Sequence, residues 1–377
     1  MITISLCMIV RNEEETLDRC LASVKGIPDE IIIVDTGSND KTKEIAIKWT
    51  PQVLDFKWID DFSAARNYSF DQATMDYILW LDADDILLPE DHQKLMKLKQ
   101  SLDFSIDSVS MIYHTLFDKF NNVIASVRRL RLVKRSKYFR WHGYVHEDIQ
   151  TDGTSKNYDS DIVVEHRKNP MQFESNRNLK IYENQIRKGK KMTSQDVFHY
   201  ARELHKHQMF DKAIKSYNHF LAFKGISVEH RLYVYNKLAS CYFAVGNREK
   251  EQEVTLKTFE YDIPRPEFCC RLGEHFLDKN QFYQATFWYK LAIDVPLPDH
   301  PLVNESQPFQ TWLPHKQLGL CFFQLGDYER SFYHNQKAHT YLPLDEGILQ
   351  NIQLLEELVK ESTERDHPKQ EDSSRHS

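Results

Sequence analysis

Apolar runs alternate with amphipathic segments through the first half of the chain. Strands are expected over residues 2–10, 30–35 and 77–81, and helices over residues 13–24 and 40–49. The second and third of these strands are apolar on both faces, which is the pattern of parallel strands buried between two helix layers. The first half is therefore predicted to form an α/β domain with a mostly parallel sheet between helices.

From about residue 194 the pattern changes to helices in which aromatic and small residues recur at set offsets. The residues at +4, +10, +13 and +17 from Leu272 are Phe276, Phe282, Ala285 and Tyr289. The same offsets from Leu318 give Phe322, Tyr328, Ser331 and Asn335, so the first three positions carry an aromatic, an aromatic and a small residue in both cases. Related anchors at Tyr200 and Leu238 give intervals of 38, 34 and 46 residues. A period of 34 is the tetratricopeptide spacing, so an all-α tetratricopeptide-repeat domain is predicted, with a generic helical bundle as the alternative.

One repeat departs from this pattern. It has Arg248 and Glu251 where the other repeats carry an aromatic and a small residue, so its second helix is expected to be irregular or partly exposed. Residues 361–377 contain almost no apolar side chains and are expected to be disordered. The expected domains are a catalytic domain over residues 1–190, repeats over 191–360 and a tail over 361–377.

Charge and composition narrow the class of protein. The net charge is -7 over 377 residues and the signs are mixed, which argues against nucleic acid as the main partner. The basic stretch 128–140 is typical of an amphipathic strand or of a groove for an anionic substrate. The first ten residues lack a secretion signal and are too few to cross a bilayer, and the six cysteines show no Cys-x-x-Cys spacing. We therefore expect a cytoplasmic chain without a transmembrane segment, with its cysteines as buried free thiols.

Three carboxylates follow the third strand within four positions, namely Asp82, Asp84 and Asp85. Such a cluster is costly without a cation, and oxygen ligands favour Mg²⁺ or Mn²⁺. Mg²⁺ is usually completed by water and phosphate oxygens, which makes a nucleotide the first substrate hypothesis. Asp35 ends the second strand, and ligands of open parallel sheets bind beyond the carboxyl ends of the strands. The alternative is a solvated turn in which Asp84 or Asp85 caps a helix.

Several common enzyme signatures are absent from the sequence. The eleven glycines are too dispersed to form a G-x-G-x-x-G fingerprint or a Walker loop, which excludes the usual dehydrogenase and P-loop readings. There is also no G-x-S-x-G elbow and no His-Glu-x-x-His pair, the commonest signatures of serine hydrolases and zinc proteases. The remaining candidate chemistry is acidic, aromatic and histidine-based.

Four motifs in order resemble those of a family 2 glycosyltransferase. They are SLCMIVRNE at residues 5–13, VDTGSND at 34–40, FSAARN at 62–67 and LDADD at 81–85. The resemblance covers about residues 1–170, and with the repeats it extends to a bacterial subgroup that includes peptide S-glycosyltransferases of the sublancin type. It implies a single Rossmann-like nucleotide-sugar domain with an Asp-x-Asp metal motif.

The resemblance implies roles for residues near the nucleotide. Asp35 would accept a hydrogen bond from the base, although a turn cap before Gly37 is the alternative. Arg66 would contact the base or the pyrophosphate, with a surface salt bridge as the alternative. Three further residues would lie beside the base and ribose: Val10, Asn12 and Glu13. Glu13 could equally serve as first-turn charge for its helix.

Within the acidic motif the resemblance implies three separate roles. Asp82 would touch the ribose, Asp84 would hold the metal on the diphosphate, and Asp85 would hold the metal or a sugar hydroxyl. His166, after the last strand of the domain, resembles a late histidine that completes the metal site or contacts the diphosphate. A structural histidine is the alternative for His166.

A second constellation, WHGYVHED, occupies residues 141–148. In this family an acidic residue at such a position serves as the general base on the acceptor, and Glu147 is the first choice, with Asp148 second. His142 and His146 are four residues apart and could instead bind zinc on a helix. Gly143 and the aromatic residues favour a strand or loop, which argues against that zinc site.

The leading hypothesis is a metal-dependent, inverting glycosyltransferase that moves a sugar from a nucleotide donor, a UDP-sugar, to a peptide, protein or glycan acceptor. Mn²⁺ or Mg²⁺ would be its cofactor. The alternative is a non-catalytic scaffold whose repeats bind a partner peptide while the first domain senses nucleotide. A homodimer through residues 200–360 is also considered. The sugar, the acceptor and the linkage atom are left open by the sequence.

Overall fold

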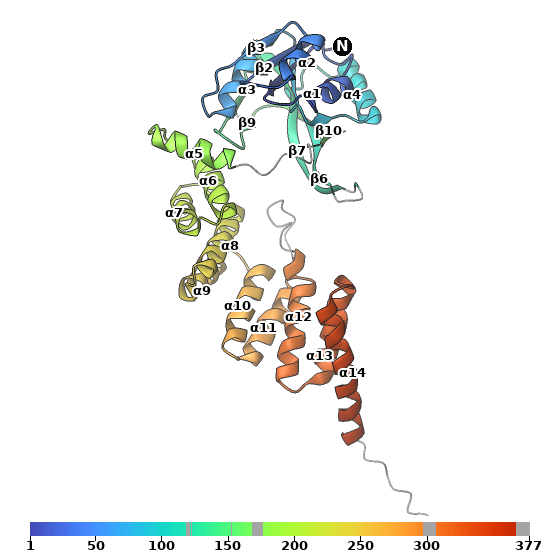
Figure 1. Cartoon of the computed structure of the whole chain (residues 1–377), viewed down its shortest axis with the longest axis vertical. Helices are drawn as coiled ribbons and strands as arrows, with labels where there is room; N and C mark the ends of the chain where they lie inside the picture. Colours follow the sequence, from blue (N-terminus) through green and yellow to red (C-terminus); the bar gives the residue numbers. More distant parts are fainter. Residues whose placement is uncertain (118–120, 122, 152, 168–175, 297–306, 367–377) are drawn as a thin grey trace, which may run out of the picture. The chain divides into compact units, whose positions relative to one another are not determined.

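The computed structural model describes residues 1–117, 121, 123–151, 153–167, 176–296 and 307–366 (Figure 1). It divides into two compact units, Met1–Glu203 and Leu204–Ser377. The first unit contains a mixed α/β domain and the second is helical, which confirms the predicted fold class. None of the helices in the described ranges combines the length and hydropathy that crossing a membrane requires.

The first unit begins with alternating strands and helices, in which the five predicted elements occur in the predicted order among others that the sequence did not predict. These are β1 (Ile4–Val10), α1 (Leu17–Ser23), β2 (Glu30–Asp35), α2 (Thr42–Trp49), β3 (Val53–Asp55), α3 (Phe62–Asp71), β4 (Tyr77–Trp80), β5 (Asp85–Ile86) and α4 (Pro89–Ser101). A strand-rich half follows, with β6 (Ser108–Phe117), β7 (Val123–Lys134), β8 (Arg140–His142), β9 (Asp148–Gln150) and β10 (Asn157–His166). The unit then continues into α5 (Arg177–Arg187) and the start of α6 (Ser194–Lys206).

Eight strands form one sheet in the order β3-β2-β1-β4-β7-β6-β10-β5. β1 pairs in parallel with both β2 and β4, so these three strands end at the same edge. β7 runs antiparallel to both β4 and β6. The basic stretch 128–140 is thus only partly a strand, because β7 ends at Lys134 and a 3-10 turn over Arg135–Lys137 separates it from β8.

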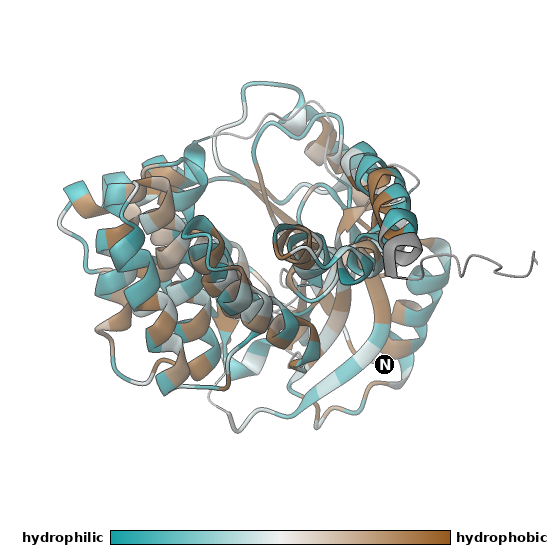
Figure 2. Cartoon of the chain, turned by 90° about the horizontal axis from the view of Figure 1, so that it is seen from below, coloured by the Kyte–Doolittle hydropathy of each residue, from teal (hydrophilic) through white to brown (hydrophobic). Residues whose placement is uncertain are grey.

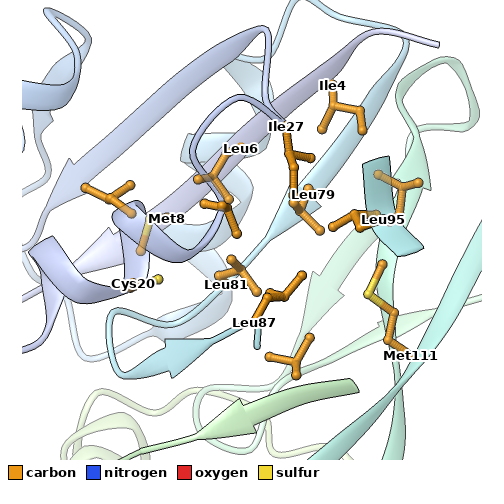
Figure 3. Packing of buried hydrophobic residues seen from close by; sticks show 14 of the residues in the cluster. Ile4, Leu6, Met8, Cys20, Ile27, Leu79, Leu81, Leu87, Leu95 and Met111 are labelled. Atoms are coloured by element: carbon orange, nitrogen blue, oxygen red, sulfur yellow. The ribbon is translucent and has the colours of Figure 1, made fainter. Parts of the chain in front are cut away.

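The core lies on both faces of this sheet. On β1, Leu6 and Met8 point to one face, where they pack with Leu79 (Figure 3), and Cys7 points to the other. Successive side chains of a strand point to opposite faces, so a strand with two buried faces must be apolar at nearly every position. This explains the continuous apolar runs of β2 and β4. All six cysteines are buried free thiols, as predicted.

The helical region consists of successive antiparallel hairpins. Its helices after α6 are α7 (Phe210–Leu221), α8 (Val228–Ala244), α9 (Arg248–Lys257), α10 (Pro266–Asp278), α11 (Phe282–Asp294), α12 (Trp312–Gln324), α13 (Tyr328–Tyr341) and α14 (Glu346–Asp366). Hydrophobic and hydrophilic residues alternate along these helices (Figure 2), as expected where only one side packs against a neighbour. α14 extends to Asp366, so part of the segment predicted to be disordered is helical, and residues 367–377 lie outside the described residues.

Close helix packing explains the repeat offsets. A Cβ on Gly273 would lie 2.7 Å from the ring of Tyr289, and one on Gly319 would overlap the amide nitrogen of Asn335. The glycine of one helix therefore makes room for the +17 side chain of the next. The atypical second repeat replaces this packing with charge, because Glu251 is buried and accepts hydrogen bonds from Arg248 and Arg271. Its second helix, α9, is regular but short, and a 3-10 turn follows it.

Replacing Gly273 by alanine is expected to destabilise the protein by about 1–3 kcal/mol, because the added methyl group overpacks against Tyr289. The measurement is the free energy of unfolding from chemical denaturation. In a Tyr289→Ala background the clash disappears, so the added cost of Gly273→Ala should largely vanish. An equal cost in both backgrounds would contradict this packing.

Candidate active site

A cavity of about 430 Å³ lies beyond the ends of β1 and β4. Its lining includes most of the residues selected from the sequence: Val10, Glu13, Arg66, Asp82, Asp84, Glu147, Asp148 and His166. These residues come from segments as far apart as β1 and β10. Asn12, Asp35 and Asp85 are outside the lining.

Asp84 and His166 lie close together in the lining of this cavity and could hold a cation. His166 Nδ1 lies 3.3 Å from Asp84 Oδ1 and 3.3 Å from Asp85 Oδ1. Among the described residues, these three form the one group whose possible ligand atoms all lie within 4.8 Å of one another. Burial disfavours a charged imidazole, but hydrogen bonds to both carboxylates outweigh burial and raise the pKa of His166 to about 9. The zinc site considered at His142 and His146 is not part of this group.

Asp85 is fully buried behind Asp84 and is engaged by four groups. Its Oδ2 accepts hydrogen bonds from Arg131 Nη1 at 2.9 Å and from the backbone N–H of Asp82 at 3.0 Å. Its Oδ1 accepts one from the Tyr113 hydroxyl at 2.9 Å and lies beside His166. Arg131 is itself fully buried and stacks on aromatic rings. Asp85 therefore holds His166 and the Asp82 backbone, and it is not part of the cavity lining.

Arg66 links the acidic motif to the Glu147 segment. Its Nε donates to Glu147 Oε1 at 2.6 Å and its Nη2 donates to Asp82 Oδ1 at 2.7 Å. The guanidinium lies over the rings of Trp80 and Trp141 at 5.1 and 4.7 Å. Burial alone would raise the pKa of Asp82, but the charges of Arg66, Arg131 and His166 and the hydrogen bond from Arg66 together outweigh burial, and the pKa is lowered. Arg66 thus neutralises two carboxylates across the cavity wall.

The end of β2 supplies a buried acceptor. Asp35 Oδ1 accepts hydrogen bonds from the amides of Gly37 and Ser38 at 2.8 and 2.9 Å, so the turn-capping alternative describes one of its oxygens. Asp35 Oδ2 is buried without a hydrogen-bond partner among the described residues. An unpartnered buried carboxylate oxygen is costly, so this oxygen is available to accept a hydrogen bond from a ligand or from water.

The other residues of the first motif have different surroundings. Asn12 has a left-handed backbone (φ 57°) and its Oδ1 accepts from the Asn39 amide, so it fastens the loop after β1 to the loop after β2. Glu13 faces the cavity, and its Oε2 accepts from the Thr16 hydroxyl at 2.6 Å. Burial, together with the nearby charges of Asp82 and Asp84, raises the pKa of Glu13.

Glu147 and Asp148 differ in exposure. The Glu147 side chain is 10% exposed and its Oε1 receives the Arg66 hydrogen bond. The Asp148 side chain is 53% exposed and lies 3.6 Å from Arg129. A hydrogen bond from Arg66 fixes the Glu147 carboxylate toward the cavity. The Asp148 carboxylate has an exposed ion pair and a hydrogen bond from the backbone N–H of Ile149, and neither contact crosses the cavity.

Sequence reasoning did not single out four cavity residues, namely Arg11, Tyr113, Arg177 and Asn178. Arg177 begins α5 and its guanidinium lies 5.0 Å from the ring centre of Phe62. Burial lowers the pKa of Arg177 despite the nearby charges of Glu147 and Glu13. Arg11 stands in the first motif, SLCMIVRNE, but was given no role there; the other three lie outside the motifs, so only the tertiary structure reveals their position.

Comparisons with known proteins show what most of the first unit is similar to. Residues 5–151 match the family model Glycosyl transferase family 2. Over 235 residues the chain is 31% identical to the SPbeta prophage-derived glycosyltransferase SunS of Bacillus subtilis, covering 59% of this chain and 54% of that protein. Over 90 residues it is 56% identical to the TPR repeat-containing protein Synpcc7942_0270 of Synechococcus elongatus, covering 24% of this chain and 22% of that protein. The chain thus spans about half or less of the length of these relatives.

A solved structure of glucosyl-3-phosphoglycerate synthase from Mycobacterium tuberculosis, in complex with Mn²⁺, UDP-glucose and glycerol 3-phosphate, is 24% identical with a TM-score of 0.26. The match covers 30% of this chain and 44% of the synthase chain, and no inference about ligands is drawn from it. The family match and the observed architecture agree with the resemblance seen in the sequence motifs. Residues 5–151 thus resemble glycosyltransferase family 2 in their sequence, and helical repeats of the tetratricopeptide type follow this domain.

Proposed function

We propose that the chain is a metal-dependent, inverting glycosyltransferase that moves a sugar from a UDP-sugar to a peptide, protein or glycan acceptor. The observation that carries this proposal is that one cavity is lined by both a cation-binding pair, Asp84 and His166, and a fixed carboxylate, Glu147. A sugar transfer needs these two functions on either side of the reacting carbon. The family 2 match and the similarity to SunS support the reaction class.

The residues around Asp84 fit a divalent metal. Carboxylate oxygens and an imidazole nitrogen within 4.8 Å of one another are a suitable donor set for Mn²⁺, and Mg²⁺ is the second choice because it prefers oxygen ligands. Asp84 and His166 would hold the ion at the cavity, with Asp85 fixing His166 from behind. A bound divalent ion would neutralise charge on the departing nucleoside diphosphate.

The nucleotide base is assigned to the end of β2. Asp35 Oδ2 is a buried acceptor without a partner among the described residues, and the N3–H of uracil is a donor of the kind it lacks. Val10 and Thr36, the latter next to Asp35 in the chain, both line the cavity. The Thr36 amide donates to the Val10 carbonyl at 3.0 Å, which holds the two residues together. Asp82 and Glu13 are assigned to the ribose side, as the family resemblance implies.

Glu147 is assigned as the general base. In a single inverting displacement, the acceptor atom bonds to the anomeric carbon while the bond from that carbon to the diphosphate oxygen breaks. Glu147 takes the acceptor proton on the opposite face. Among the hydrogen bonds of the described residues, Arg66 occupies only Oε1, which leaves Oε2 for the acceptor. Asp148 is the second choice.

Arg66 is assigned a role different from the direct nucleotide contact expected from the sequence. Two hydrogen bonds and two aromatic rings hold its guanidinium between Asp82 and Glu147. A charge held in this way orients its carboxylate partners at little further entropic cost. Arg66 would therefore set the position of the base and of the ribose contact together.

Replacing Asp35 by asparagine tests the nucleotide assignment. The amide oxygen of Asn can still cap Gly37 and Ser38, but its NH₂ group would face the base N–H, so UDP should bind about 10- to 100-fold more weakly. The measurement is the UDP dissociation constant by calorimetry with Mn²⁺ present. Asp55→Asn, at the exposed end of the neighbouring strand β3, is the matched control and should bind UDP as the wild type does. Unchanged affinity in Asp35→Asn would overturn the assignment.

A further inference from the structure

The segment that carries Glu147 is held from several sides. We name residues 143–147, between β8 and β9, the base loop. Helix α3 holds its start, since the Ser63 hydroxyl donates to the Gly143 carbonyl at 2.6 Å and the Phe62 amide donates to the Tyr144 carbonyl at 3.0 Å. Gly143 itself has a φ of 104°, a conformation that favours glycine.

Helices α5 and α6 hold the middle of the base loop. The Tyr182 hydroxyl on α5 donates to the Val145 carbonyl at 3.0 Å, and Val145 packs against Tyr182 and Ile181. From α6, Asp196 accepts the Tyr144 amide at 3.3 Å. Each residue of the loop up to Val145 is therefore fixed through its backbone by a helix outside the loop.

His146 is the last residue before Glu147 and has the most unusual conformation. Its φ is 55°, in the left-handed region, which for a non-glycine residue costs about 1–2 kcal/mol and needs compensating contacts. Those contacts come from α6. Glu203 Oε1 lies 3.1 Å from His146 Nε2, the ring of His199 stacks on that of His146 at 4.5 Å, and Gln195 Nε2 donates to the His146 carbonyl at 3.3 Å.

Glu203 and His199 on α6 are well suited to hold the imidazole ring of His146 in place. The Glu203 side chain is 10% exposed and its Oε1 also accepts from Asn178 Nδ2 at 3.2 Å, which fixes the carboxylate. His199 stays neutral because burial, with the nearby His146, lowers its pKa to about 3, so it stacks without repelling His146. Asn178 and His146 both line the cavity, so this arrangement lies at the site itself.

We propose that Glu203 and His199, on the helix that opens the repeats, are positioning residues for the base. By holding His146 in its left-handed conformation they set the direction in which the next residue, Glu147, enters the cavity. This inference rests on the proposed function for its catalytic consequence. It makes α6 a working part of the catalytic unit as well as the first helix of the repeats.

The test compares Glu203→Ala, Glu203→Gln and His199→Ala with wild type in Mn²⁺-dependent UDP release from UDP-sugars. Glu203→Ala should lower kcat by about 10- to 100-fold, because supporting partners of site residues have effects of that size. The dissociation constant for UDP should change less than about 2-fold, since Glu203 is not assigned to the nucleotide. Glu203→Gln can still accept the His146 hydrogen bond and should recover most of the loss. Asp211→Ala, an exposed carboxylate in the first turn of α7, is the matched control.

A second readout separates this inference from the proposed function. Amide hydrogen exchange of residues 143–148 reports directly how firmly Glu203 and His199 hold the base loop. Exchange should be faster in Glu203→Ala and His199→Ala but not in Asp211→Ala. If the wild type releases no UDP, the proposed function fails, but the exchange result still shows whether Glu203 and His199 hold the base loop in place. Unchanged exchange in the base loop, or an equal loss of kcat and UDP affinity in Glu203→Ala, would overturn the positioning role.

Discussion

Replacing Glu147 by glutamine is expected to lower kcat by about 100- to 10,000-fold, because the variant loses the group that takes the acceptor proton. The amide oxygen of glutamine can still accept the Arg66 Nε–H, which lies 2.6 Å from Oε1 in the native protein, so fold and UDP affinity should be preserved. The measurement is steady-state sugar transfer alongside UDP calorimetry.

Asp148→Asn is the matched control for the base. Asp148 is adjacent in sequence but half-exposed, and its contacts are an exposed ion pair with Arg129 and a hydrogen bond from the Ile149 amide, so its loss should lower kcat by less than about 10-fold. A collapse of kcat in Asp148→Asn with near-normal turnover in Glu147→Gln would transfer the assignment of the base to Asp148.

Replacing Asp84 by alanine is expected to lower metal-dependent turnover by roughly 1,000-fold, because the ion supplies several kcal/mol of charge stabilisation to the departing diphosphate. Mn²⁺ binding, measured by the loss of its free electron paramagnetic resonance signal, should weaken in parallel. Glu90→Ala removes an exposed carboxylate in the first turn of α4 and should change neither quantity. Normal Mn²⁺ binding in Asp84→Ala would contradict the placement of the ion.

The fold could be predicted from the sequence where buried side chains produce a regular pattern of apolar or small residues. β1, β2 and β4 carry long apolar runs because they are covered on both faces, and a glycine recurs at Gly273 and Gly319 because the helices meet there. The end of the last helix was less accessible. α14 continues to Asp366 on polar residues, which form helix readily without producing an apolar stripe.

The site was only partly accessible from the sequence. The acidic motif is local, so three nearby carboxylates could be recognised as a group. The different surroundings of the three carboxylates depend on distant residues. Asp85, for example, accepts a hydrogen bond from the buried Arg131, 46 residues later in the chain. Likewise Arg66 meets Glu147 across 81 residues, a contact that no spacing reveals. His146 and Glu203 are brought together by the packing of α6 and left no motif.

The most direct measurement of the central claim is UDP release from a panel of UDP-sugars by the wild-type chain, with Mn²⁺ and then with excess EDTA. We expect release from at least one donor, abolished by EDTA and restored by added Mn²⁺. No release from any UDP-sugar, or release that EDTA leaves undiminished, would contradict a metal-dependent transfer at Asp84 and His166.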